Sequence, residues 1–297
     1  MRKAFASLML EVAEADDSLV VMVGDISHGI LQPLAARFPE RYYNIGICEP
    51  TIVNMASGLS KTGLTPVVHT IAPFIIERSF EQLKLDFEYE QQSVNLVSVG
   101  SGFDYSKLGC THHCYDDIAL LRQLPSSTIF VPGTSEEFRS QFLSSYRSDG
   151  IKYYRLSEQS NTSASFAGGG THLVRRGEDV TIVALGTRLN AALEAAQLLE
   201  ALVSCEVFLV NRIKPLDDAE IRGSVARTGR LVTVEEHSVI GGLADSLCQS
   251  LAGSRYVNQA LGVREFLHMY GTHEDLCVRA GVSADDIVAA ARLLTEV

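Results

Sequence analysis

Short apolar runs alternate with amphipathic segments along the first half of the chain. The opening repeats apolar residues at Phe5, Leu8, Met9 and Val12, a spacing that predicts a helix. Apolar runs of strand length follow, at residues 19–23, 42–47, 66–71, 95–99, 128–131 and 151–156. Helical patterns lie between them, at residues 31–38, 51–60, 75–87, 116–124 and 135–148. Continuous apolar strands alternating with helices predict a mostly parallel sheet covered on both faces.

The same rhythm restarts after a polar stretch of small residues at positions 157–170, which ends in three glycines. Further strands are predicted at residues 180–185, 207–210 and 231–234. Further helices are predicted at residues 189–202, 218–225, 243–251 and 284–295. We therefore expect two three-layer α/β domains with mostly parallel sheets, at residues 1–160 and 173–297, joined by a linker at residues 161–172.

Composition narrows the class of protein. The 297 residues are 46% hydrophobic and 21% charged, which is typical of a soluble globular protein with a sizeable core. A net charge of -11, no tryptophan and no basic patch exclude a nucleic-acid binder. No apolar run approaches the ~20 residues of a membrane span, and the N-terminus lacks a secretory pattern. The six cysteines have no framework spacing, so we expect reduced thiols and a cytoplasmic protein.

Acidic, aromatic and histidine side chains follow successive predicted strands. Glu49 stands where the strand 42–47 gives way to the helix 51–60, Phe74 follows the strand 66–71, and His112 and His113 come after the strand 95–99. Because open α/β sheets hold ligands at the carboxyl ends of their strands, this group predicts half of an active site. His28 and His69 also lie by strand ends, where a place in the cleft and a structural role are equally expected.

Several motifs carry a family resemblance. Residues 38–49, 109–112 and 117–122, and the spaced residues Pro66, Thr70, Phe74, Arg78 and Gln82, resemble the pyrimidine-binding domain of transketolase-type thiamine diphosphate enzymes. Residues 179–186 and 234–242 resemble the C-terminal domain of transketolase. The resemblance covers nearly the whole chain in the family's order. Related arrangements occur in 2-oxoacid dehydrogenase beta subunits and in deoxyxylulose-phosphate synthase.

The resemblance implies that thiamine diphosphate is the cofactor. Glu49 matches the family's catalytic glutamate, which bonds to the aminopyrimidine ring, and the alternative is a helix-start acid favoured by the helix dipole. Phe74 matches the aromatic residue that stacks on that ring, with a plain core phenylalanine as the alternative. Ile47 and Arg78 are implied to line the same cofactor site. For Arg78, substrate binding or an ion pair with a helix acid is also expected.

The resemblance assigns substrate contacts to histidines. His112 matches the histidine that contacts the substrate carbonyl or hydroxyl and handles protons, and an ordinary pKa near 6.5 suits that task. His113, His28 and His69 are candidates to share the pocket. A zinc site in the run Cys110–Cys114 is the less favoured alternative, because five adjacent residues cannot easily surround one ion.

The sequence also lacks part of the family's cofactor site. The family holds the diphosphate and its metal with Gly-Asp-Gly and a later pair of asparagines, whereas Gly24-Asp25 is followed here by Ile26 and Asn54 is single. We therefore expect no metal ligands in this chain. An N-terminal partner subunit would hold the diphosphate and Mg²⁺ in an α2β2 assembly, with two copies of this chain forming a homodimer within it.

Departures from the family suggest the substrates. Where sugar-phosphate transketolases use an arginine and a histidine to bind phosphate, this chain has Glu158 and Gly100, and Leu108 replaces an acid. The leading hypothesis is the C-terminal subunit of a split transketolase that moves a two-carbon ketol unit from a ketose to an aldehyde or keto-sugar acceptor. We expect a specialised role in surface or secondary sugar metabolism. The alternatives are a subunit of a 2-oxoacid-decarboxylating enzyme and a non-catalytic scaffold.

Overall fold

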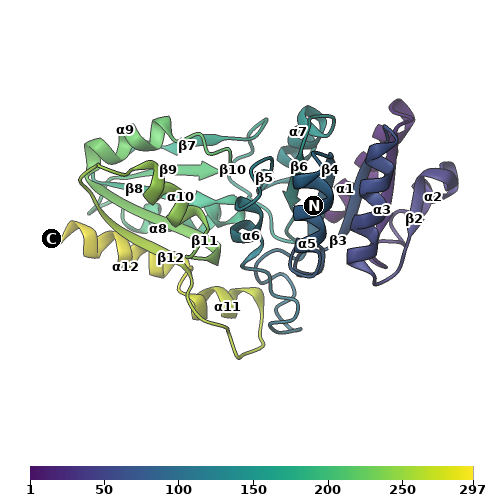
Figure 1. Ribbon diagram of the computed structural model, residues 1–297. Helices are drawn as coiled ribbons and strands as arrows, with labels where there is room; N and C mark the ends of the chain where they lie inside the picture. Colours follow the sequence, from purple (N-terminus) through teal and green to yellow (C-terminus); the bar gives the residue numbers. More distant parts are fainter. Residues whose placement is uncertain (297) are drawn as a thin grey trace.

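Two mostly parallel β-sheets lie side by side in the computed structural model, which describes residues 1–296 (Figure 1). The seven-stranded sheet has the order β10-β5-β6-β4-β3-β1-β2, and the five-stranded sheet has the order β12-β11-β8-β9-β7. The first sheet contains β1 (Leu19–Val23), β2 (Tyr42–Asn44), β3 (Thr65–Ile71), β4 (Val94–Val99), β5 (Thr128–Phe130), β6 (Ile151–Arg155) and β10 (Arg212–Lys214). The second contains β7 (Thr171–Arg175), β8 (Val180–Leu185), β9 (Cys205–Val210), β11 (Arg230–Ser238) and β12 (Val257–Val263). The predicted fold class is confirmed.

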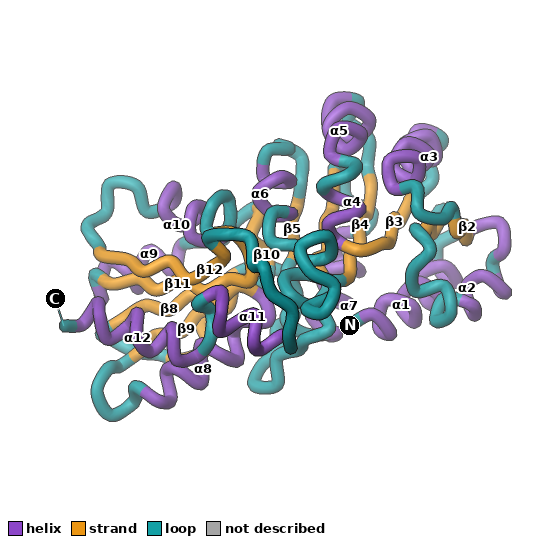
Figure 2. Tube along the Cα trace, turned by 90° about the horizontal axis from the view of Figure 1, so that it is seen from below, coloured by secondary structure: helices purple, strands orange, loops and turns teal. Residues whose placement is uncertain are grey.

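Helices cover both faces of each sheet (Figure 2). One face of the first sheet packs on α1 (Arg2–Ala15), α2 (Gln32–Arg37) and α7 (Ser135–Ser145). The other face packs on α3 (Glu49–Lys61), α4 (Ala72–Ile76), α5 (Phe80–Gln82), the π-helix Leu83–Tyr89 and α6 (Asp117–Arg122). The second sheet lies between α9 (Ala219–Thr228) and α10 (Leu243–Ser250) on one face, and α8 (Leu189–Leu198), α11 (His273–Ala280) and α12 (Ala284–Thr295) on the other. Two 3-10 turns, Pro39–Arg41 and Gly186–Arg188, complete the order.

The strand β1 shows why a continuous apolar run gives this layering. Its five residues are all buried, and successive side chains point to opposite faces. Val20 and Met22 join the cluster under α3 and α4, whereas Val21 and Val23 join the cluster under α1 and α7. A polar residue at any position of this strand would therefore face a layer of helices instead of water.

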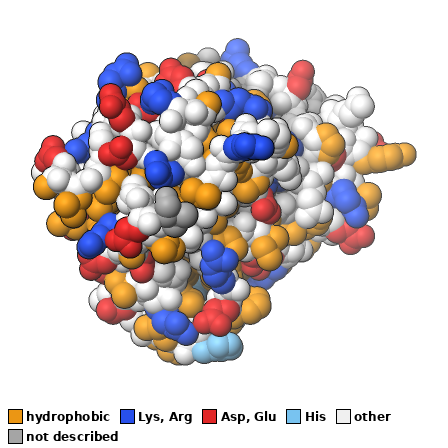
Figure 3. Space-filling view, turned by 90° about the vertical axis from the view of Figure 1, so that its left-hand side faces the viewer, with side chains coloured by type: hydrophobic (Ala, Val, Ile, Leu, Met, Phe, Trp, Pro, Cys, Tyr) orange, Lys and Arg blue, Asp and Glu red, His pale blue; other side chains and the backbone are white. Residues whose placement is uncertain are grey.

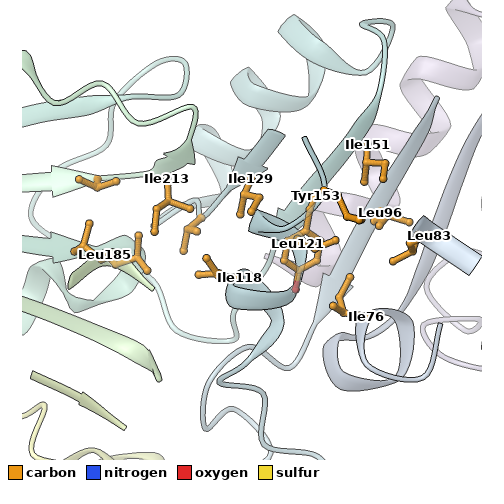
Figure 4. Close-up of a cluster of buried hydrophobic side chains, with 14 of the residues drawn as sticks. Ile76, Leu83, Leu96, Ile118, Leu121, Ile129, Ile151, Tyr153, Leu185 and Ile213 are labelled. Atoms are coloured by element: carbon orange, nitrogen blue, oxygen red, sulfur yellow. The ribbon is translucent and has the colours of Figure 1, made fainter. Parts of the chain in front are cut away.

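The two halves of the chain share one hydrophobic cluster. It runs from Leu96 and Ile151 in the first sheet to Leu185 and Ile213 in the second half (Figure 4). The strand β10 belongs to the second half by sequence but pairs antiparallel with β5 of the first sheet. The polar stretch at 157–170 is fixed as well, because the Phe166 amide donates to Glu137 Oε1 over 3.1 Å. The boundaries expected at residues 160 and 173 stay a prediction.

Several local predictions differ from the structure. The helix expected at 75–87 is divided between α4, α5 and the π-helix Leu83–Tyr89. The strands β7, β10 and β12 and the helix α11 were not predicted. These strands are short or half-exposed and lie at sheet edges, so their sequences lack the continuous apolar runs that marked the central strands.

The surface is of mixed charge. On the end of the molecule formed by the second half, basic and acidic side chains are interspersed, with hydrophobic ones between them (Figure 3). Such a face has no extended basic stripe for a phosphate backbone to follow. Across residues 1–296, every helix is either too short or too polar to cross a bilayer.

Candidate active site

The predicted site residues lie at one edge of the first sheet. The strands β1, β2, β3 and β4 are mutually parallel through the pairs β1–β2, β1–β3 and β3–β4, so their carboxyl ends open on the same side. Glu49 follows β2, Phe74 follows β3, and His112 lies in the loop of residues 100–116 after β4, here named the His112 loop. The topology therefore brings together side chains that are 63 positions apart at most.

Glu49 is the first residue of α3, and it is buried. Pro50 follows it in the first turn, where its fixed φ and missing N–H suit a helix start. The side chain is only 3% exposed, and the Oε2 atom lies 3.5 Å from Nη1 of Arg78. The Oε1 atom is buried without a hydrogen-bond partner among the described residues. Buried polar atoms are nearly always paired in folded proteins, so this oxygen can accept a hydrogen bond from a ligand.

Phe74 and Arg78 form the wall beside this carboxylate. The guanidinium carbon of Arg78 lies 3.8 Å from the centroid of the Phe74 ring, within the range of a cation–π contact. Arg78 therefore reaches from the ring face to the Glu49 carboxylate, although its side chain is 48% exposed. The Arg78 guanidinium is itself a flat group with N–H donors, and it lies between Phe74 and Glu49. A ligand with a flat ring and N–H donors would therefore fit in the same place.

His112 completes the group through an edge-on contact with Phe74. Its ring centroid lies 5.1 Å from that of Phe74 at 70°, and 5.8 Å from that of Tyr105 at 73°, both edge-on arrangements. Its Nδ1 atom pairs with the Thr111 hydroxyl at 2.9 Å, which leaves Nε2 as the atom available to a ligand. Burial, and then the charge of Arg78, lower the pKa of His112, so the neutral ring prevails at neutral pH.

The structure does not bring His113 into this group. Its side chain is 2% exposed and packs edge-on against Phe103, with centroids 5.6 Å apart. Both ring nitrogens lack a hydrogen-bond partner within residues 1–296. Burial lowers the pKa of His113, which keeps the ring neutral. The expected substrate contact of His113 has no geometric support here.

The other two histidines lie at the β1 side of the edge. His69 is fully buried, with Nδ1 2.7 Å from the Val97 carbonyl oxygen and Nε2 2.9 Å from the Ser27 hydroxyl. Burial lowers its pKa to about 4, so it serves as a neutral link within the core. His28 is exposed and, with Arg2 and other residues, lines a cavity of about 520 Å³. Only His28 of this pair is open to a ligand.

Ile47 differs in burial from Glu49, and the cysteines of the His112 loop form no metal site within residues 1–296. Ile47 is 68% exposed, two positions before the buried Glu49. Cys110 is exposed and Cys114 is buried, and neither belongs to a group of three ligand atoms close enough to share an ion within residues 1–296. The zinc alternative for residues 110–114 therefore has no geometric support.

Sequence reasoning missed two features of the site. Asn44 Oδ1 accepts hydrogen bonds from the amides of Asp25 (3.0 Å) and Gly46 (3.1 Å), and so ties the β1 loop to the backbone before Glu49. An asparagine followed by a glycine two positions later after a strand could have indicated this turn. Tyr105 packs over Gly100, where a Cβ would lie 2.3 Å from the tyrosine ring. Nothing in the spacing of the sequence indicated that contact.

The fold and the acid, ring and histidine together define a two-domain α/β chain that presents part of a ligand site at its strand ends. Comparison with family models matches residues 1–162 to the pyrimidine-binding domain of transketolase and residues 169–287 to the transketolase C-terminal domain. The chain belongs to the transketolase family.

Relatives of similar length include subunits of divided transketolases. The chain is 30% identical to the 6-deoxy-6-sulfo-D-fructose transketolase subunit SqwH of Clostridium sp. (strain MSTE9), covering 100% of this chain and 94% of the relative. It is also 30% identical to a subunit of the apulose-4-phosphate transketolase of Phocaeicola vulgatus, covering 98% of this chain and 96% of that relative. A solved split-gene transketolase, described as an inactive beta4 tetramer, superimposes with a TM-score of 0.89 at 32% identity, covering 99% of this chain and 98% of that chain.

Proposed function

We propose that this chain is the C-terminal subunit of a two-component, thiamine diphosphate-dependent transketolase. It transfers a two-carbon ketol unit from a ketose donor to an aldehyde or keto-sugar acceptor. The observation that carries the proposal is the buried Glu49 Oε1, which has no hydrogen-bond partner within residues 1–296. Arg78 connects this carboxylate to the face of Phe74, and His112 contacts the same ring edge-on. In a family that depends on thiamine diphosphate, this arrangement matches the pyrimidine end of the cofactor.

The residues present fit that cofactor end. Glu49 offers a carboxylate oxygen to a ring nitrogen and can hold or share a proton there, and Phe74 offers its face for stacking. When bound, thiamine diphosphate supplies the nucleophilic carbon that carries the two-carbon unit. His112 presents a neutral ring that can accept a proton from a substrate hydroxyl or donate a hydrogen bond to a carbonyl. Arg78 leaves the Phe74 face when the pyrimidine ring binds.

The site requires a partner. An N-terminal subunit holds the diphosphate and Mg²⁺, and two copies of each subunit form an α2β2 assembly, with the two copies of this chain in contact, in the cytoplasm. Exposed apolar side chains before and after Glu49 in the sequence support a covered surface, since Tyr43, Ile47 and Met55 are 40%, 68% and 43% exposed. The solved relative described as an inactive beta4 tetramer agrees with a subunit that associates but does not act alone.

The acceptor differs from an ordinary sugar phosphate. Glu158 is exposed, and its amide donates to Asp104 Oδ2 over 2.9 Å, which fixes an acidic residue where the family places an arginine. At Gly100 the space of a histidine side chain is filled by the Tyr105 ring. A carboxylate repels a phosphate dianion, whereas an arginine fork binds it. We therefore assign a specialised transfer to an acceptor other than an ordinary pentose or tetrose phosphate, in surface or secondary sugar metabolism.

Titration calorimetry tests the assembly. Thiamine diphosphate with Mg²⁺ is titrated into this chain alone and into its mixture with the product of the adjacent gene. Binding to the mixture alone is expected, followed by turnover of a ketose donor. Tight binding to the isolated chain would contradict the divided site. Release of CO₂ from pyruvate without ketose turnover would replace the transfer reaction with 2-oxoacid decarboxylation.

The substitution Glu49→Gln tests the site. It keeps the shape of the side chain and removes the carboxylate that exchanges a proton, so turnover of the assembled enzyme should fall by about 10²–10⁴-fold. Glu136→Gln, at an exposed acid in α7 on the opposite face of the sheet, is the matched control and should keep full turnover. Unchanged turnover in Glu49→Gln, with normal assembly, would remove Glu49 from the catalytic role.

A further inference from the structure

The base of the His112 loop is tied to the second half of the chain. Gly102 and Cys114 exchange two backbone hydrogen bonds of 2.9 Å each, which close the loop. The amide of Phe103 donates to Glu236 Oε2 of β11 over 3.3 Å. Arg155 Nη2 donates to the carbonyl oxygens of Cys114 (2.7 Å) and Glu236 (3.0 Å), and so bridges the loop to β11.

The far part of the loop is contacted by the segment between β12 and α11. This segment, residues 264–272, is named here the C-terminal strap, and it passes beside the His112 loop in both ribbon views (Figures 1 and 2). The ring of Tyr270 covers Gly109, where a Cβ would lie 2.8 Å from the tyrosine Cε1. Phe266 contacts Tyr115 at a centroid distance of 6.0 Å. Gly109 is buried for this reason, whereas Tyr270 is still 70% exposed.

The strap is fixed at its end by a buried ion pair. His273 follows the strap as the first residue of α11, and its Nε2 lies 3.0 and 3.1 Å from the two carboxylate oxygens of Glu236. The Arg188 Nε lies 3.0 Å from the same carboxylate. Burial alone would raise the pKa of Glu236, but Arg188 and His273 lower it to about 2. Glu236 is therefore an anion held by the Arg188 guanidinium and by the His273 ring, whose pKa Glu236 raises.

Glu236, His273 and Cys277 place their ligand atoms within 4.8 Å of one another, which is close enough for a metal ion. A metal cation would have to enter beside the Arg188 guanidinium, which already compensates the carboxylate charge. Burial raises the pKa of the Cys277 thiol well above neutral pH, so it also lacks the charge of a good ligand. The cluster is an anchor made of ion pairs.

Gly109 determines where the backbone of His112 lies. Its carbonyl oxygen accepts hydrogen bonds from the amides of His112 (2.9 Å) and His113 (3.1 Å), which form the turn that carries the histidine ring. Its φ of +78° lies in the left-handed region, where glycine is favoured. Because glycine has no side chain, the residue cannot fix the turn by a side-chain contact of its own. The contact with Tyr270 fixes the turn from outside the loop.

We infer that Tyr270 is a positioning residue, which holds Gly109 and thereby keeps the His112 ring against Phe74. The Glu236–His273 ion pair fixes the strap that carries Tyr270. The second half of the chain thus takes part in the site without touching the substrate. The catalytic consequence rests on the proposed function, whereas the effect on the loop does not.

Hydrogen exchange of the full-length chain tests the inference directly. Tyr270→Ala should raise the exchange rates of the His112, His113 and Cys114 amides by about tenfold, because local opening becomes easier by roughly 1.4 kcal/mol. Tyr270→Phe keeps the ring and should exchange like the wild type. Glu265→Gln is the matched control, since Glu265 lies on the same strap and the substitution breaks only an exposed 3.0 Å pair with Arg279 of α11.

Unchanged exchange in Tyr270→Ala would overturn the inference, as would an equal increase across the whole chain. His273→Ala provides a second variant, which releases the end of the strap and leaves the Phe103–Glu236 hydrogen bond in place, and it should accelerate the same amides. In the assembled enzyme, Tyr270→Ala should lower kcat/KM about tenfold and Tyr270→Phe should restore it. If the amides loosen but no variant or wild type transfers a ketol unit, the proposed function fails and the positioning role of Tyr270 stands.

Discussion

The residues in front of and behind the His112 loop are paired very differently. The front group consists of Glu49, Phe74, Arg78 and His112. The back network consists of Asp117, Tyr153, Arg155, Glu236 and His237. In the back network, Asp117 Oδ2 accepts hydrogen bonds from Tyr153 at 2.6 Å and Arg155 at 2.7 Å, and all three residues are buried. In the front group, the one ion pair is 3.5 Å long and half-exposed on the arginine side.

The difference shows that the back network supports the fold, whereas the front group is available to bind a ligand. Strong, charge-assisted hydrogen bonds behind the loop fix the backbone that carries the functional side chains. One carboxylate oxygen in each group, Asp117 Oδ1 and Glu49 Oε1, lacks a hydrogen-bond partner within residues 1–296. The Glu49 carboxylate has only the 3.5 Å contact with the half-exposed Arg78, so a ligand displaces only a weak contact there. Three experiments test this contrast, from the largest expected effect to the smallest.

The largest effect is expected in the back network. Arg155→Met leaves Asp117 as a buried charge without its main partner, so the free energy of unfolding should fall by about 3–5 kcal/mol. Urea unfolding measures it. Arg139→Met is the control, because it breaks an equally direct pair with Glu11 that is exposed on both sides, and it should cost about 1 kcal/mol or less. Equal losses in the two variants would break the comparison.

The second prediction concerns acid. Burial lowers the pKa of His69 and of His237 to about 4, although nearby Asp117 opposes the shift at His237. In the unfolded chain these histidines titrate near pH 6.5, so between pH 6.5 and 4 the unfolded state binds protons that the folded state does not. The contribution of these two histidines to stability is therefore complete above pH 6.5 and falls toward pH 4, by up to about 3 kcal/mol for each histidine. Burial raises the pKa of Glu77, Asp104 and Glu235 to about 7, and these three acids change stability in the opposite direction.

Urea unfolding at a series of pH values checks this slope. The substitution His69→Gln removes one titrating group, so relative to the wild type the variant should gain up to about 3 kcal/mol of stability between pH 6.5 and 4, whatever it does to stability at pH 7. The exposed His268 is the control position, and His268→Gln should leave the slope as it is. A slope that survives in His69→Gln without change would contradict the depressed pKa of the buried ring.

The smallest effect is expected in the front group. Arg78→Met removes the pair with Glu49 and keeps an apolar contact with Phe74, so the free energy of unfolding should change by less than about 1 kcal/mol. Measurement by the same urea titration makes the value comparable with that of Arg155→Met. A loss of about 3 kcal/mol would mean that the front pair supports the fold, as the back network does.

Much of the fold could be predicted from the sequence, because a buried parallel strand such as β1 is a continuous apolar run. The edge elements were missed for the opposite reason. β12 carries Asn258 and Gln259 and is half-exposed, and β10 has only three residues. The helix α11 could have been found from Thr272 and Asp275, which form a capping box. Its short apolar face gave no periodic signal.

The candidate site was predictable to the extent that it depends on strand ends. Glu49, Phe74 and His112 each follow a strand of one sheet, so the topology alone brings them together. The sequence could not tell His112 from His113, because neighbouring residues in a turn take different sides according to tertiary packing. The contact of Tyr270 with Gly109 joins segments that are 161 positions apart, and no local pattern encodes it.

The strand β10 also determines what happens when the chain is cut. A protease that cleaves within residues 157–170 separates the peptide into two fragments, but β10 on the second fragment remains hydrogen-bonded to β5 on the first. The shared cluster around Ile129 and Ile213 holds the same two fragments from within. We expect the nicked protein to elute as one species under native conditions and to separate only in denaturant. In this molecule, the integrity of the first sheet depends on a strand supplied from beyond the cut.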